Sequence, residues 1–243
     1  MSKTIPKTSH GTIVIEGFPG MGGVSSITSK YIIDFFRLKK VTTLDLDSMP
    51  PVTIVRNRRP VPAVGVYGGM LPSGRRIAVI HSEIPAPEKG IRKIASEISH
   101  WAKSINASLL LSAQGMVVER DIGDQGEIGI YGTSSSARGE RMLKNAGINI
   151  MEEGVITGIP GLLLAEGAKR HLTTVALLAE SGTSQINPGS AALMIHAIDV
   201  LCLNSNMDCG PICNLALESI NGNRLLIRKE MNDKELLPGL VYR

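Results

Sequence analysis

Two copies of a short glycine-proline segment are the residues of this chain with the clearest potential for binding chemistry. The first copy, Gly17-Phe18-Pro19-Gly20-Met21-Gly22, follows the apolar run 12–15, and the second, Gly158-Ile159-Pro160-Gly161, follows residues 154–157. Glycine permits a positive φ or a close backbone approach, and proline presets the φ of the first turn of a helix. Each copy therefore predicts a crowded corner at which a strand ends and a helix begins.

The first corner is a candidate anion site, because backbone amides at the start of a helix attract negative charge. Its spacing matches neither Gly-x-x-x-x-Gly-Lys-Ser/Thr nor Gly-x-Gly-x-x-Gly, and it contains no lysine that could pair with a phosphate. A tight packing corner is the favoured interpretation of both segments, and ligand binding is the alternative.

Catalytic chemistry is suggested by His81-Ser82-Glu83, which places a base, a hydroxyl and a carboxylate at the end of an expected strand. Neighbouring side chains on a strand face opposite ways, however, so His81 and Ser82 should not meet. The sequence also lacks a Gly-x-Ser-x-Gly elbow. Glu166 and Glu180 follow apolar runs and could pair, although structural carboxylates are the favoured interpretation. We therefore predict no catalytic residue and no enzyme.

Metal and cofactor sites are not indicated. Cys209 and Cys213 offer one possible ligand pair, with Cys202 upstream, whereas zinc requires four ligands or three and a water. Three cysteines without a disulfide framework fit a reducing cytoplasm. We expect no metal, no cofactor and a cytoplasmic protein.

Composition limits the partners that the chain could have. Of its 243 residues, 43% are hydrophobic but only 3% are aromatic, and the net charge is +4. Because aromatic side chains supply the stacking platform for single-stranded nucleic acid, we expect no nucleic-acid partner. The arginines of the segment 56–59 then form a solvated surface or meet an acidic protein. No stretch approaches the roughly 20 apolar residues of a membrane span.

The elements that must position these residues alternate between strand and helix. Unbroken apolar runs predict strands at 12–16, 41–46, 52–55, 63–67, 76–81, 108–112 and 172–179, with short strand material at 128–131 and 148–150. Apolar residues at helical spacing predict helices at 24–38, 85–105, 134–146, 162–170 and 188–203. Residues 68–74 are expected to form a turn.

This alternation predicts an α/β fold, a three-layer α/β/α sandwich with a mainly parallel sheet. Composition does not change at any midpoint, so residues 11–203 are expected to form a single domain. Residues 1–10 are expected to be a flexible N-terminus. Residues 204–243 are expected to be a C-terminal helical segment that ends in an apolar tail.

The two corners, taken in order with Glu166-Gly167, the run 177–180, Asn187-Pro188 and Ala191-Ala192, resemble the archaeal and bacterial homologues of proteasome assembly chaperone two. The likeness covers most of residues 11–203. The resemblance implies a fold similar to that of purine nucleoside phosphorylase, a homo-oligomer and no established enzymatic activity. One departure is Gly22-Gly23-Val24, where relatives often carry Gly-Leu-Val-Gly.

The resemblance also gives the C-terminus a role. Family members that act on proteasomes end in a hydrophobic residue, a tyrosine and any residue, and this chain ends in Val241-Tyr242-Arg243. In those proteins the tail enters a pocket between neighbouring α subunits of the core particle. The alternative is that these residues form a last β-strand or a tail that packs on the chain's own domain. An oligomer would present several tails at once and so strengthen a weak contact.

Three functions remain open on the sequence. The first is an ATP-independent proteasome assembly chaperone or core-particle binder whose partners are the proteasome α subunits and its own copies. The second is a small-molecule or nucleotide-binding enzyme of phosphorylase-like fold, using the first corner with His81, Glu83 or Glu180. The third is an oligomeric scaffold with another partner.

Overall fold

A computed structural model describes residues 11–117, 128–181, 187–210 and 212 of the chain. The strands are β1 (Thr12–Gly17), β2 (Lys39–Thr43), β3 (Thr53–Arg56), β4 (Arg59–Pro62), β5 (Val64–Met70), β6 (Arg76–Ser82), β7 (Ala107–Val117), β8 (Ile130–Ser134), β9 (Asn149–Ile150) and β10 (Thr174–Ser181). The helices are α1 (Val24–Phe35), α2 (Ile91–Ser104), α3 (Ala137–Asn145), α4 (Gly158–Arg170) and α5 (Pro188–Ile198), with 3-10 turns at Met21–Gly23 and Glu88–Gly90 and a π-helical turn at Asp199–Leu203.

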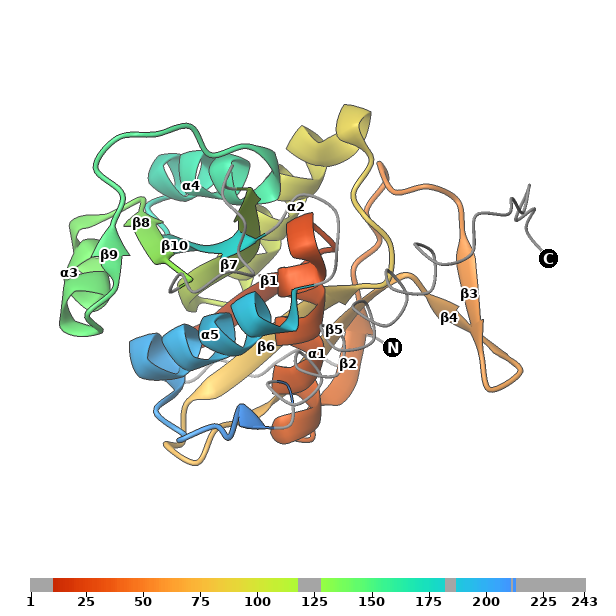
Figure 1. Ribbon diagram of the computed structural model, residues 1–243. Coiled ribbons are helices and arrows are strands. Elements are labelled where there is room, and N and C mark those ends of the chain that lie inside the picture. The colour runs from red at the N-terminus through yellow and green to blue at the C-terminus, as the bar shows by residue number, and fades with distance from the viewer. Residues whose placement is uncertain (1–10, 118–127, 182–186, 211, 213–243) are drawn as a thin grey trace, which may run out of the picture.

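Eight of these strands form one sheet in the order β2-β5-β6-β1-β7-β10-β8-β9 (Figure 1). The central strands β6, β1, β7 and β10 run parallel, whereas β5 is antiparallel to β6 and β8 is antiparallel to β10. Helices cover both faces, with α2 and α4 above the sheet in Figure 1 and α1 and α5 below it. The predicted α/β/α sandwich with a mainly parallel sheet is confirmed.

The side chains of β1, a central strand, point alternately into the two hydrophobic layers on either side of the sheet. Ile13 and Ile15 are buried in the cluster that contains α1 and α5, while Val14 is buried in the cluster that contains α2 and α4. Successive side chains of a strand point to opposite faces, so a strand buried on both sides is apolar throughout. Glu16, one pleat beyond Val14, interrupts this apolar run.

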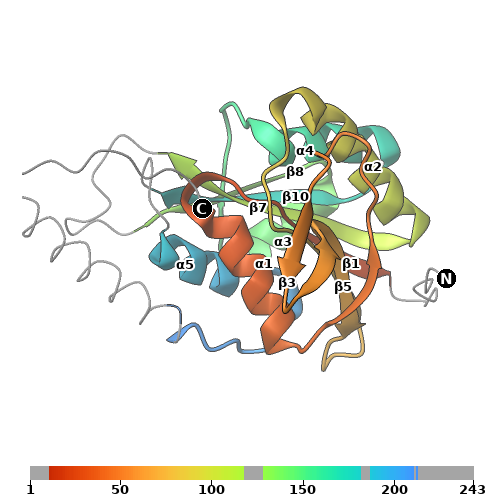
Figure 2. The ribbon, with the colours of Figure 1, turned by 90° about the vertical axis from the view of Figure 1, so that its right-hand side faces the viewer.

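The chain leaves neighbouring strands toward opposite faces of the sheet. After β1 it enters α1 in one layer, and after the adjacent β6 it enters α2 in the other (Figure 2). In open α/β sheets such a divergence leaves a crevice at the carboxyl ends of the strands, where ligands commonly bind. The first glycine-proline segment and His81 both lie at this edge.

Some predicted boundaries are wrong. Residues 68–70 were expected in a turn but belong to β5, where a Cβ on Gly69 would stand 2.7 Å from the Leu38 side chain. Here glycine allows a close approach and does not mark a turn. The strand β4 carries two prolines and was not predicted at all. It pairs with β3 alone, in a separate hairpin that projects from the sheet (Figure 1).

The described residues that follow the last helix return to the core. Met207 and Ile212 are buried in the same cluster as α1 and α5. Within the described ranges, no helix combines the length and apolar character needed to cross a bilayer. The predicted flexible N-terminus, residues 1–10, and the predicted docking tail, Val241-Tyr242-Arg243, lie outside the described residues.

Candidate functional site

The first glycine-proline segment is a strand-to-helix corner, as predicted. β1 ends at Gly17, and after Phe18, Pro19 and Gly20 a 3-10 turn leads into α1. A Cβ on Gly17 would overlap the Cβ and Oγ of Ser29, so this glycine lets α1 pack directly on β1. Phe18 is buried in the layer of α2 and α4. The segment therefore joins the sheet to both layers.

The second segment differs from its prediction, because no strand precedes it. Residues 154–157 have no regular structure, Val155 is 90% exposed, and α4 begins at Gly158 itself. A Cβ on Gly161 would overlap the carbonyl oxygen of Ile156. The missing side chain thus lets residues 154–157 lie against the first turn of α4, and they do not extend along the sheet. The expected strand-to-helix corner is wrong at this copy.

The two segments nevertheless meet at one cavity. Gln114 on β7 lies between them, since a Cβ on Gly20 would stand 3.4 Å from its Cγ and a Cβ on Gly158 would stand 3.3 Å from its Oε1. The cavity, here called the corner cavity, has a volume of about 480 Å³. It is lined by Glu16, Phe18, Pro19, Gly20, Met21, Pro85, Ala86, Ile91, Ala113, Gln114, Gly158 and Ile159.

The corner cavity contains a carboxyl group that sequence reasoning missed as a site residue. Glu16 is 2% exposed and accepts hydrogen bonds from the backbone N–H of Phe18 at 2.6 Å and from the Ser112 hydroxyl at 2.5 Å. Burial raises its pKa to about 7, against the lowering effect of these two hydrogen bonds. The sequence feature that could have identified Glu16 is its position, as an acid at the end of an apolar strand and directly before Gly17.

Glu16 makes stability depend on pH. Its pKa is raised from 4.5 to about 7, so the stability that its protonated form contributes is complete below about pH 4.5 and is lost as pH rises through 7. The loss amounts to about 3 kcal/mol above that range. In a Glu16→Gln variant the amide oxygen can still accept from the Phe18 N–H, the amide NH2 can donate to the Ser112 hydroxyl oxygen in place of the bond that Ser112 now donates, and the side chain cannot ionise. We expect thermal melts to show a higher Tm than the parent at about pH 8 and a similar Tm at about pH 5. A Tm that falls equally at both pH values would contradict this assignment.

An anion is a poor match for this cavity. Among the described residues that line it, none is lysine or arginine, and its titratable residue is an acid. An ionised Glu16 repels a phosphate at neutral pH. The predicted alternative of a nucleotide site at the first corner therefore gains no support from the charge of the lining.

The prediction that His81 and Ser82 do not meet is confirmed. The Ser82 hydroxyl donates to the carbonyl oxygen of Ile84 at 2.6 Å, whereas Nδ1 of His81 lies 2.8 Å from the Oγ of Ser29 on α1. Burial lowers the pKa of His81 and so favours the neutral form of the ring. Ser29 is only 1% exposed and cannot reach a substrate. This serine-histidine pair therefore holds α1 against β6.

Glu166 and Glu180, the two acids named from the sequence as a possible pair, have separate partners. Glu166 on α4 pairs with Lys169 at 3.0 Å and with Arg170 at 3.1 Å, which lowers its pKa. Glu180 at the end of β10 accepts a hydrogen bond from the N–H of Gly129 at 2.8 Å. The structure thus provides two structural carboxylates and does not bring them together as a pair.

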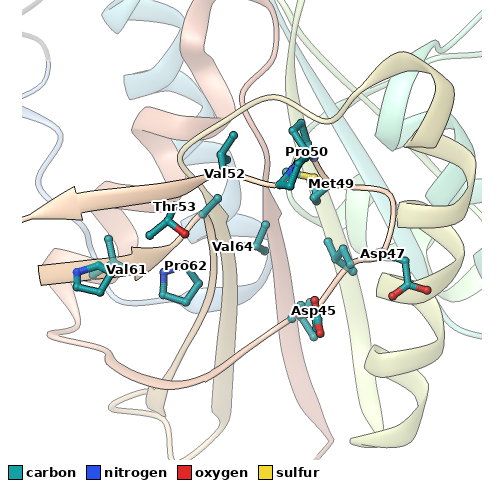
Figure 3. A pocket seen from close by; sticks show the side chains of 14 residues that line it. Asp45, Asp47, Met49, Pro50, Val52, Thr53, Val61, Pro62 and Val64 are labelled. Atoms are coloured by element: carbon teal, nitrogen blue, oxygen red, sulfur yellow. The ribbon is translucent and has the colours of Figure 1, made fainter.

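A second hollow lies under the β3–β4 hairpin and has a volume of about 690 Å³. Figure 3 shows side chains that line it, with Val61 and Pro62 on β4 and Pro50 and Val52 on the segment that leads into β3. Asp47 at its rim is paired with Lys93 of α2 at 2.7 Å. The described lining holds no histidine, cysteine or serine, and its carboxylates, Asp45 and Asp47, stand beside mostly apolar side chains, so this hollow offers no nucleophile with a base beside it. Nor do the described residues contain three metal-binding side chains in one cluster.

Comparison with known proteins shows which family and which solved structures this chain is similar to. The sequence profile of the PAC2 family matches residues 14–210. An uncharacterized protein of Methanocaldococcus jannaschii is 26% identical over 197 residues, which are 81% of this chain and 78% of that protein. Pyrococcus furiosus PbaA, an archaeal homologue of proteasome-assembly chaperone, has a TM-score of 0.80 at 26% identity, over 94% of this chain and 92% of PbaA.

A further solved structure shares the fold. Pyrococcus furiosus PbaB, an archaeal proteasome activator, has a TM-score of 0.79 at 20% identity, over 92% of this chain and 96% of PbaB. The fold of this chain therefore has close counterparts in both solved structures.

Proposed function

The chain belongs to the PAC2 family, and from that premise we propose that it is an ATP-independent proteasome assembly chaperone or core-particle-binding protein. The observation that carries the proposal is the likeness to PbaA, a proteasome-assembly chaperone homologue, at a TM-score of 0.80 and 26% identity. The likeness covers more than nine-tenths of both chains, so it concerns nearly their full length and not one shared segment.

In this proposal the α/β domain builds the oligomer, and the C-terminal residues make the contact with the proteasome. Val241, Tyr242 and Arg243 dock between neighbouring α subunits of the core particle. The tyrosine combines apolar contact with a hydroxyl hydrogen bond, and the terminal carboxylate can pair with a basic group in the pocket. The two glycine-proline segments then keep a structural role at the junction of the sheet and its helices.

Self-association completes the mechanism. A tail of three residues buries little surface and binds weakly, whereas a homo-oligomer presents several tails to the α ring. After the first tail has docked, the others bind from within the same complex, which can raise the overall affinity by about 10²–10⁴. The proposed site of action is the cytoplasm.

A pull-down with the full chain as bait tests the proposal. Purified core particles and free α subunits are offered separately, and we expect the full chain to capture at least one of them. Capture of free α subunits alone favours an assembly chaperone, and capture of finished particles favours a binder or activator. Capture of neither contradicts the proposal and favours an oligomeric scaffold with another partner.

A further inference from the structure

The corner cavity has the composition of a small-molecule site. Its volume of about 480 Å³ lies within the range of roughly 300–1,000 Å³ that is usual for ligand pockets. Its walls are mostly apolar, from Phe18, Pro85, Ile91 and Ile159, and its polar side chains are those of Glu16 and Gln114. It opens at the carboxyl edge of the central strands, between β1 and the diverging β6 connection.

The acceptor capacity of Glu16 is only half used. A carboxylate offers about four lone-pair sites. Oε1 accepts from the Phe18 N–H and Oε2 accepts from the Ser112 hydroxyl, which leaves one acceptor site on each oxygen. Among the described residues that line the cavity, Glu16 is the titratable one, and burial, Ser112 and Phe18 account for its altered pKa. An ionised Glu16 therefore has no cation beside it in this lining.

A ligand could supply the missing positive charge. A buried carboxylate is costly unless it is paired and hydrogen-bonded, and an amidine or guanidine group can donate two parallel hydrogen bonds to a carboxylate. We propose that the corner cavity binds a small organic cation that carries an amidine, guanidine or primary amine head on an apolar body. The head pairs with Glu16, and the body lies against Phe18, Ile91 and Ile159.

The opposite ligand charge is the competing possibility. The first turn of α4 carries no acidic residue, and its N-cap Thr157 makes no side-chain hydrogen bond to the helix. Free amides at such a helix start favour anions. The ionised carboxyl of Glu16 outweighs them, because it is a full charge buried in the same cavity. The charge of the ligand that binds more tightly therefore discriminates between a cation site and an anion site.

Three isosteric probes test the inference on the full chain. Benzamidine is a planar cation, benzamide is its neutral counterpart, and benzoate is the anion of the same shape. Isothermal titration calorimetry should show that benzamidine binds at least about tenfold more tightly than benzamide, with no detectable benzoate binding. Because the ionised carboxylate is the binding form, benzamidine affinity should rise by at least about tenfold from about pH 5 to about pH 8.

Matched variants separate the site from general effects. Glu16→Gln should abolish both the preference for benzamidine and its pH dependence. Glu166→Gln removes a carboxyl on α4 that lies outside the cavity lining and pairs with Lys169 and Arg170, and it should leave both unchanged. Ala86→Phe adds a large side chain to the lining, leaves the carboxyl group of Glu16 in the chain and should also prevent binding. It keeps the test valid should Glu16→Gln fail to fold.

Three results would overturn the inference. They are equal or tighter binding of benzoate, benzamidine binding that survives both Glu16→Gln and Ala86→Phe, and no binding of any probe at millimolar concentration. None of these results bears on capture of core particles, so the cavity and the proposed proteasome function stand or fall separately.

Discussion

Replacing Gly17 with alanine is expected to destabilise the protein by about 3 kcal/mol, because overpacking at a fully packed site costs about this much. The added Cβ would overlap the Cβ and Oγ of Ser29, so α1 must move away from β1. That movement also disturbs the contact between Ser29 and His81, which spans 2.8 Å. For a chain of this size we expect Tm to fall by roughly 6–12 °C in a thermal melt.

Gly20 provides the matched control within the same segment. Its backbone is extended, with φ −145°, and a Cβ there would meet Gln114 at 3.4 Å, which is an ordinary van der Waals separation. Gly20→Ala should therefore change stability by less than about 0.5 kcal/mol. If the two substitutions lowered Tm equally, the glycines of this segment would not be explained by close packing of α1.

Replacing Tyr242 with alanine is expected to cause the largest loss of partner binding. In the proposed complex this side chain supplies both buried apolar surface and a hydroxyl hydrogen bond, and truncating such an interface tyrosine costs about 2 kcal/mol or more. The loss recurs at every tail of an oligomer, so the avidity of the whole assembly falls further. Surface plasmon resonance on immobilised core particles measures the change.

Arg243 is the control for that substitution. The family pattern accepts any residue at the last position, so Arg243→Ala should bind nearly as the parent does. Size-exclusion chromatography of both variants should show an unchanged oligomer. A Tyr242→Ala variant that binds core particles as tightly as Arg243→Ala would remove the tyrosine from the contact.

The central elements of the fold could be predicted from the sequence because their residues are buried on both sides. Unbroken apolar runs identified β1, β6 and β10, and the spacing of Ile94, Ile98 and Ala102 identified α2, since those residues form its buried stripe. These patterns reflect burial, which local sequence records directly.

Proline and glycine led to the wrong predictions. Pro60 and Pro62 indicated a break, yet they lie in β4, a strand of a two-stranded hairpin where a missing N–H need not interrupt a larger ladder. The strand predicted at 108–112 was too short, because β7 continues to Val117, and Gly115 within it makes room for the carbonyl oxygen of Met21. Whether a glycine turns the chain or admits a neighbour depends on tertiary contacts.

The corner cavity was beyond sequence reasoning for the same reason. The two glycine-proline segments are about 140 residues apart in the sequence, and only the fold brings Gly20 and Gly158 next to the same side chain, that of Gln114 on β7. Glu16 was not predicted as a site residue, because a single acid in an apolar strand has no recognisable motif. Its role depends on the Phe18 amide and on Ser112 of the neighbouring strand.

Co-sedimentation of purified core particles with the full chain and with a chain that ends at Leu240 tests the central claim most directly. We expect the full chain to sediment with the particles and the shortened chain to remain in the supernatant, while both give the same Tm and the same oligomer. Equal co-sedimentation of the two chains would contradict docking through Val241, Tyr242 and Arg243.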